Sequence, residues 1–260
     1  MADTDHLVLS KDGAIATLLI NRPDKRNPIS FAMWQALPGL VEQIENDDEI
    51  RALVIRGAGD KAFSAGADIA EFSTYRADSQ GARVYNEATH VAERALAGLS
   101  KPAIAMIHGF CIGGGAEIAL ACDLRFADSN ARFGITPARL GIVYSLTATK
   151  QLSDLAGPAV TKYILFSGEH LLAKRAHEAG VIDELLEPDQ LEQRTYEFAR
   201  LIASRSQYSV RSSKRIVQKI QAGQIEDDDE TLKLRNDSFD GEDYKEGVRA
   251  FLDKRPPNFG

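Results

Sequence analysis

Three consecutive glycines at 113–115 constrain this chain most, because they stand between a buried strand and the start of a helix. They follow the apolar run at 103–107 and lead into the short apolar stretch at 118–122. Glycines at a helix start cost backbone entropy, and a structural turn rarely needs three. They expose N–H groups at the positive end of the helix, which is a natural site for an anion or an oxyanion. No Lys-Ser/Thr pair follows and no G-x-G-x-x-G spacing occurs, which excludes a phosphate P-loop and a dinucleotide loop.

Strands and helices alternate along most of the sequence. Short aliphatic runs predict buried strands at 14–20, 52–57, 103–107 and 123–127. Apolar residues spaced by three and four predict helices at 30–45, with Ser30 as N-cap, and at roughly 81–99. This alternation predicts an α/β fold with right-handed crossovers. After about residue 190 the strands stop, and helices are expected at 190–222 and 228–251.

Composition excludes several kinds of partner. The chain has 260 residues, is 44% hydrophobic and carries a net charge of −7. Nucleic acids and anionic membranes select for basic surfaces, so neither is an expected partner. The two cysteines, Cys111 and Cys122, stand in apolar surroundings without metal-ligand spacing, so we expect reduced core residues and no metal site. The sequence shows no signal region and no run of transmembrane length, which favours a cytoplasmic location.

Another loop of small residues, the first of the two along the chain, lies at 62–69, after the strand at 52–57. Small residues let a backbone approach a ligand closely, although a plain strand–turn–helix corner with Asp68 as a cap is an alternative. Two loops that each follow a strand can aim one N–H apiece at a single point. A thioester oxygen that gains negative charge there would be stabilised by about 3–4 kcal/mol per donor.

The two loops resemble the oxyanion-hole motifs of the crotonase (enoyl-CoA hydratase/isomerase) superfamily. The strings are KAFSAGADIAEF at 61–72 and KPAIAMIHGFCIGGGAEIALACDLRFA at 101–127. NRPDKRNPIS at 21–30 resembles the superfamily's early CoA-binding turn, and EGVRAFLDKRPPNF at 246–259 resembles its C-terminal signature. The resemblance implies an acyl-CoA thioester as substrate, with coenzyme A part of that substrate and no separate cofactor.

The resemblance also implies an architecture. Members fold as a crotonase-like spiral of ββα turns with a helical C-terminal trimerisation region, within the α/β class. We therefore expect a spiral core at 1–190 and a helical oligomerisation region at 191–260. The expected assembly is a homotrimer or a dimer of trimers.

Site residues are carried over position by position. Ala67 and Gly114 would supply the two oxyanion N–H groups. The positions expected along the CoA path, those in the tail often contacting CoA of a neighbouring subunit, are Arg26, Ala65, Asp68, Ile69, Phe251 and Lys254. Without the resemblance, Arg26 and Lys254 would be interpreted as ordinary solvated surface charges.

Glu117 is the expected acid–base residue. It matches one of two catalytic glutamates in the superfamily's hydratases, whereas a first-turn glutamate favoured by the helix dipole is the structural alternative. Burial in an apolar pocket would raise its pKa toward the range that suits proton transfer. His108 and Ser64 are weaker polar candidates, for which structural roles are preferred.

The second glutamate of those hydratases is missing from its expected place. It lies in a Phe-Gly-x-Pro-Glu string, but the stretch at 133–141 reads FGITPARLG. The string at 136–146, TPARLGIVYSL, is similar to TP-x-x-LG-x-x-Y in methylmalonyl-CoA decarboxylase-like members, which makes Tyr144 the polar group there. Those members have a histidine at the place of Ala67.

Several reactions therefore stay open: hydration, double-bond isomerisation, or decarboxylation of a malonyl-type CoA thioester. A catalytically weak acyl-CoA-binding paralogue is the non-enzymatic alternative. Because one carboxylate would have to serve as both acid and base, we expect crotonyl-CoA hydration to be slow.

Overall fold

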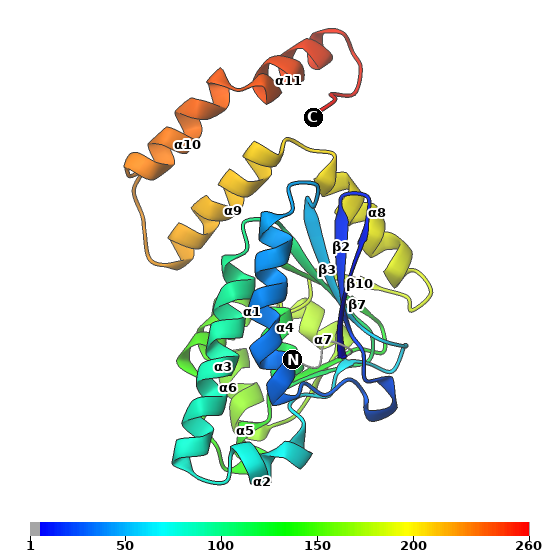
Figure 1. Ribbon diagram of the computed structural model, residues 1–260, viewed down its shortest axis with the longest axis vertical. Coiled ribbons are helices and arrows are strands. Elements are labelled where there is room, and N and C mark those ends of the chain that lie inside the picture. Colours follow the sequence, from blue (N-terminus) through cyan, green and yellow to red (C-terminus); the bar gives the residue numbers. More distant parts are fainter. Residues whose placement is uncertain (1–5, 260) are drawn as a thin grey trace.

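The computed structural model describes residues 6–259, which form two β-sheets flanked by helices (Figure 1). In the larger sheet β2, β3, β5, β7 and β10 run parallel and β1 pairs antiparallel with β2. Its strands, in spatial order, are β1 (Leu7–Asp12), β2 (Ile15–Ile20), β3 (Ala52–Gly57), β5 (Ala103–Ile107), β7 (Leu124–Asp128) and β10 (Glu184–Leu186). The strands predicted at 14–20, 52–57, 103–107 and 123–127 are thus confirmed.

The second sheet is built from very short strands. In spatial order they are β4 (Ala62–Ser64), β6 (Phe110–Ile112), β8 (Arg132–Gly134) and β9 (Leu171–Leu172), of which only β9 is antiparallel to its neighbour. The chain repeatedly places one strand in the larger sheet, the next in the smaller sheet, and then a helix. This repeat is the expected spiral of ββα turns, and it confirms the α/β fold class.

Helices cover both faces of the larger sheet (Figure 1). One face packs against α1 (Phe31–Asn46), α3 (Ser79–Gly98) and the buried α4 (Gly114–Ala121). The predicted N-cap of α1 is confirmed, since the Ser30 hydroxyl accepts the Met33 N–H at 3.3 Å. The opposite face is covered by α8 (Leu191–Ala203) through Leu191, Ala199 and Ala203. The remaining helices of this part are α2 (Phe72–Tyr75), α5 (Pro137–Leu140), α6 (Leu146–Ser167) and α7 (Ala173–Glu178), with short 3-10 turns η2 (Pro23–Lys25) and η3 (Ile69–Glu71).

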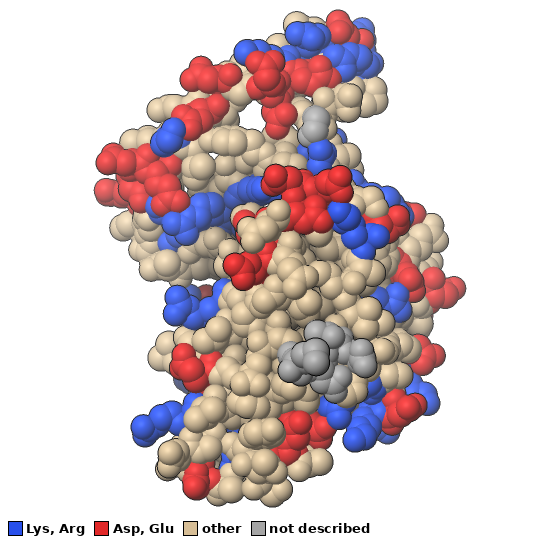
Figure 2. Space-filling model, viewed as in Figure 1, with Lys and Arg blue, Asp and Glu red and all other residues tan. Residues whose placement is uncertain are grey.

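The C-terminal region is helical, as predicted, and comprises α9 (Gln207–Gln221), α10 (Asp229–Asp240) and α11 (Glu242–Leu252). We call α10 and α11 the arm; it lies at the opposite end of the molecule from α2 and α5 (Figure 1). Lys219 of α9 pairs with Asp228 and Glu230 at 2.5 Å, and these charges gather where the arm begins (Figure 2). Since α8 packs on the larger sheet, it is α9 and the arm that extend away from that sheet. The predicted division of the chain at 190/191 stays a prediction.

Two further expectations bear on the core and the surface. Cys111 and Cys122 are both buried and unbonded to each other, which confirms them as core residues. Among residues 6–259, no helix combines the length and apolarity needed to cross a bilayer.

Candidate active site

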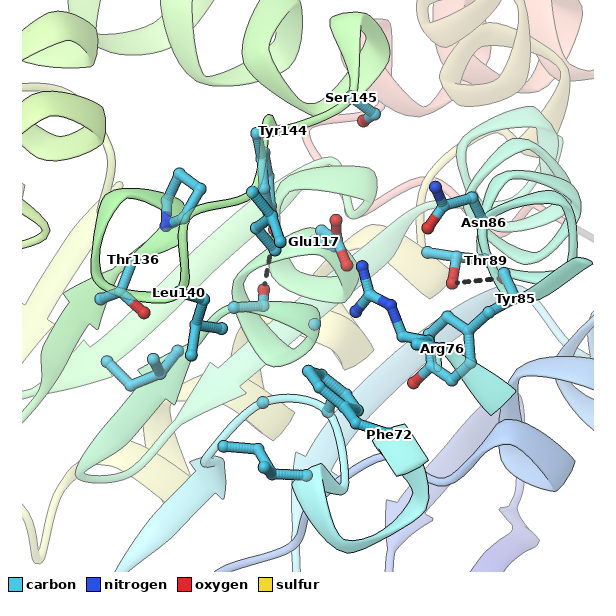
Figure 3. Close-up of a pocket in the computed structure, with 18 of the residues that line it drawn as sticks. Phe72, Arg76, Tyr85, Asn86, Thr89, Glu117, Thr136, Leu140, Tyr144 and Ser145 are labelled. Atoms are coloured by element: carbon cyan, nitrogen blue, oxygen red, sulfur yellow. Dashed lines mark hydrogen bonds between the residues drawn. The ribbon is translucent and has the colours of Figure 1, made fainter. Parts of the chain in front are cut away.

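A pocket opens between the two glycine loops, the segment from α2 to α3, and the stretch at 136–145 (Figure 3). Its apolar walls include Trp34, Phe72, Leu140 and Val143. Its polar side chains are Arg76, Tyr85, Asn86, Thr89, His90, Glu93, Glu117, Thr136, Tyr144 and Ser145. An apolar pocket with a few converging polar groups is the usual form of a small-molecule site.

The first loop is fixed by backbone bonds that leave one amide unused. Ile29 N–H donates to the Gly66 carbonyl at 2.8 Å, and Asp68 N–H donates to the Ile29 carbonyl at 2.9 Å. These two bonds flank Ala67, whose own N–H has no acceptor within the described chain. The loop presses close to the second one, since a Cβ on Gly66 would lie 3.0 Å from the Ile112 carbonyl oxygen.

Gly114 begins α4, so no earlier turn of the helix accepts its N–H. A Cβ at Gly114 would lie 3.6 Å from the Ala67 nitrogen and 3.7 Å from Oε2 of Glu117. The same Cβ would lie 2.9 Å from the ring of Trp34, so only glycine fits. The structure therefore brings Ala67, Gly114 and Glu117 together around one small space, as the sequence predicted.

Glu117 reaches the pocket from the first turn of α4, beside Tyr144 and Arg76 (Figure 3). Burial raises the pKa of Glu117 to about 6, against the lowering effects of the Tyr144 hydroxyl and the Arg76 charge. The Tyr144 hydroxyl also donates to the Gly113 carbonyl at 3.3 Å. Tyr144 thus lies at the pocket, and Glu117 can exchange a proton near neutral pH.

Glu93 is a second carboxylate in the pocket, and the sequence analysis missed it. It comes from α3 and is only 3% exposed. Burial, and then the charge of Glu117, raise the pKa of Glu93 to about 8. The available signal was an acid on the apolar face of a predicted helix, since Glu93 stands with Tyr85, Ala92 and Leu96 among the buried residues of α3.

Arg76 was also missed, because it lies in the short connection between α2 and α3. Its guanidinium stacks over the rings of Phe72 and Tyr85, with centroid distances of 4.6 and 4.9 Å. Within the described residues no carboxylate forms an ion pair with it. The Arg76 guanidinium is therefore held in the pocket by contacts with two aromatic rings, and it can bind an anionic group of a ligand.

Four of the expected CoA-path residues surround the first loop. The Arg26 backbone carbonyl accepts a hydrogen bond from the Ala65 N–H at 2.9 Å. The Arg26 guanidinium lies 5.2 Å from the centroid of the Phe110 ring. Ala65 lines the pocket, and Ile69 stands at its rim with 65% of its surface exposed. Asp68 caps η3 and pairs with Arg22 at 2.6 Å. Burial is the largest single influence on the pKa of Asp68 and raises it, but the hydrogen bond and charge of Arg22, with smaller effects of the Ala70 amide and Lys25, together lower it.

The two tail residues lie elsewhere. Phe251 is exposed on α11 and Lys254 is exposed just after it, and neither lines the pocket of its own chain. Their predicted contact with CoA would therefore have to be made at another subunit's pocket.

His108 and Ser64, the weaker candidates, make hydrogen bonds that support the fold. His108 Nδ1 pairs with Asp128 Oδ2 at 2.9 Å. The buried Ser64 hydroxyl accepts the Gly66 N–H at 3.2 Å and so supports the first loop. Neither side chain lines the pocket.

Known proteins resemble this chain over nearly its whole length. The family model described as Enoyl-CoA hydratase/isomerase matches residues 10–260. A short-chain-enoyl-CoA hydratase of Clostridium acetobutylicum is 35% identical over 257 residues, covering 97% of each chain. A methylmalonyl-CoA decarboxylase of Escherichia coli is 30% identical over 249 residues, covering 94% of each. The crystal structure of an enoyl-CoA hydratase/isomerase family protein from Hyphomonas neptunium superposes with a TM-score of 0.95 at 39% identity, covering 100% of this chain and 99% of that one.

Proposed function

Since this chain belongs to the enoyl-CoA hydratase/isomerase family of enzymes, we propose that it binds an acyl-CoA thioester and carries it through an enolate. The observation that carries the proposal is the pair of unbonded amides at Ala67 and Gly114, next to the Glu117 carboxylate. A thioester oxygen placed between the two amides gains two donors as its negative charge develops. Each such donor is typically worth about 3–4 kcal/mol in the transition state.

In this proposal Glu117 is the residue that accepts a proton during the reaction. Its carboxylate lies beside the space where the thioester would sit, and its pKa of about 6 leaves it ionised at neutral pH. An ionised carboxylate in this position can act as general base toward a water molecule or toward the α carbon of the substrate. Tyr144 would orient the Glu117 carboxylate or a water beside it.

Among enolate reactions we favour hydration of a 2-enoyl thioester. Support comes from relatives named as hydratases, including a crotonyl-CoA hydratase of Syntrophomonas wolfei at 34% identity. The expectation of slow hydration rested on a single carboxylate. The rate of hydration stays a prediction, but Glu93 lines the same pocket as Glu117 and would supply a second carboxyl group.

The CoA part would lie along the first loop. Ala65 and Ile69 line the pocket. Arg26 and Asp68 would border the CoA path beyond it, and the exposed Phe251 and Lys254 would contact CoA bound by a neighbouring subunit. Asp68 would act mainly by holding Arg22 and the η3 turn, because its carboxylate is already paired. Coenzyme A would be part of the substrate in this scheme.

Decarboxylation of a malonyl-type thioester is the second candidate. It is supported by the Arg76 guanidinium in the pocket, which no carboxylate of residues 6–259 pairs with and which can hold a substrate carboxylate. The position of Tyr144 beside Glu117 is a second support. Loss of CO₂ would also leave an enolate at the two amides, so the same donors would serve.

A panel of CoA thioesters with mass detection of products tests both candidates. Enoyl-CoA substrates should gain 18 mass units, the mass of one water, if hydration is the main reaction. Malonyl-type thioesters should lose 44 mass units, the mass of CO₂, if decarboxylation is. Failure to change any thioester, or equal calorimetric affinity for a thioester and its free acid, would contradict the proposed function.

A further inference from the structure

Glu93 is the buried charged group that the scheme above leaves unused. Glu93 is 3% exposed, and its Oε1 atom has no hydrogen-bond partner within the described chain. Leaving a carboxyl group buried and unpaired costs free energy, so a purely structural glutamate would be expected to find a partner. Instead the side chain faces the cavity that Glu117 lines.

The groups that share this cavity come from every element packed around it. α4 contributes Glu117, the α2–α3 connection contributes Arg76, and the loop before α6 contributes Tyr144. α3 itself adds Tyr85 and His90, while α1 contributes Trp34 and no charge among the described lining residues. A second carboxyl group therefore lines the same cavity as the first, and Arg76 is the arginine among the residues that line it.

We propose that Glu93 is a second catalytic residue, which holds the proton delivered to the substrate's α carbon while Glu117 takes a proton from water. This inference rests on the proposed function. It replaces the carboxylate that the stretch at 133–141 lacks with one from α3.

The step balances as an addition of water. Glu117 removes a proton from water as the oxygen bonds to the β carbon. The electron pair of the carbon–carbon double bond moves toward the thioester oxygen, where the amides of Ala67 and Gly114 hold the negative charge. The enolate then takes the Glu93 proton at its α carbon. Transfer of the proton from Glu117 back to Glu93, directly or through water, restores the pair.

The charge states of the pair agree with these roles. Burial raises the pKa of both carboxyls, to about 6 for Glu117 and about 8 for Glu93, and the Glu117 charge adds to the shift of Glu93. Between these values the pair carries one proton, which gives one base and one acid. The pH dependence of kcat/KM for hydration should accordingly rise near pH 6 and fall near pH 8, because kcat/KM reports the groups of the free enzyme.

The test is the pH profile of enoyl-CoA hydration for the unaltered protein, Glu93→Gln, Glu93→Asp and the control Glu87→Gln. Glu87 lies on α3 but is exposed and outside the pocket. We expect Glu93→Gln to lower kcat by roughly 10²- to 10⁴-fold with little change in KM, and to lose the alkaline fall. Glu93→Asp should recover part of the rate together with the alkaline fall, and Glu87→Gln should match the unaltered protein.

Three results would overturn the role of Glu93: an unchanged rate in Glu93→Gln, a slow Glu93→Gln that keeps the alkaline fall, or no alkaline fall in the unaltered protein. The last of these needs no variant to fold. A different failure, in which the unaltered protein hydrates no enoyl-CoA, would overturn the proposed function itself.

Discussion

Gly114 shows how a backbone position can determine chemistry at the scale of one residue. Adding a Cβ there brings carbon to 2.9 Å from Trp34 and 3.6 Å from the Ala67 nitrogen. We expect Gly114→Ala to push the thioester away from both amides and to lower kcat by about 10²–10³-fold, the loss typical of removing one oxyanion donor. Steady-state kinetics with an enoyl-CoA measures this.

Gly39→Ala is the matched control for that substitution. Gly39 is exposed within α1, and a Cβ there meets no atom within 4 Å. It should keep full activity and raise the free energy of unfolding by about 1 kcal/mol, because alanine favours a helix interior. Full activity in Gly114→Ala would contradict the placement of the thioester between the two loops.

At the scale of elements, the sequence predicted four strands of the larger sheet and none of the smaller one. Runs such as 103–107 are buried on both faces, so their composition alone identifies them. The strands β4, β6, β8 and β9 have two or three residues, too few to show any periodicity. β1 was missed because most of its residues face solvent.

The candidate site likewise has residues that the sequence could identify and residues that only the structure reveals. Ala67, Gly114 and Glu117 lie in two continuous strings, so a resemblance could identify them. Glu93 and Arg76 enter the pocket only because α3 and the connection before it pack over the second loop. No spacing along the chain links Glu93 to Glu117, and only the packed helices reveal the pair.

The junction between α9 and α10 should loosen in acid. Arg215 and Lys219 lower the pKa of Glu230 to about 2, and Lys219 lowers the pKa of Asp228. A carboxylate with a depressed folded pKa stabilises the fold above its unfolded pKa and stops doing so as pH falls through the folded value. For Glu230 that loss runs from about pH 4.5 down to about pH 2.

Hydrogen exchange in α10 measures this junction. We expect Lys219→Met to speed exchange at pH 7 and to weaken its acid dependence, since both ion pairs disappear. Lys174→Met is the control, because the exposed Lys174–Glu178 contact at 3.9 Å is of the kind that contributes little. Equal protection of α10 in Lys219→Met and the unaltered protein would show that the ion pairs do not hold the arm.

At the scale of the whole molecule, the arm exposes large apolar side chains that a monomer would leave in water. They include Leu232, Phe239, Tyr244, Phe251 and Leu252. Contiguous exposed apolar surface is typical of protein interfaces, so we predict a homotrimer or a dimer of trimers. Sedimentation equilibrium at micromolar concentration should give a trimer-based mass, and a monomer there would refute the prediction.

The central claim, that Glu117 performs proton transfer beside two backbone donors, is tested most directly by comparing crotonyl-CoA hydration in the unaltered protein and in Glu117→Gln. The amides of Ala67 and Gly114 survive this change, so thioester affinity should stay nearly constant while kcat falls by roughly 10²–10⁴-fold. Hydration by Glu117→Gln at the rate of the unaltered protein would contradict the account.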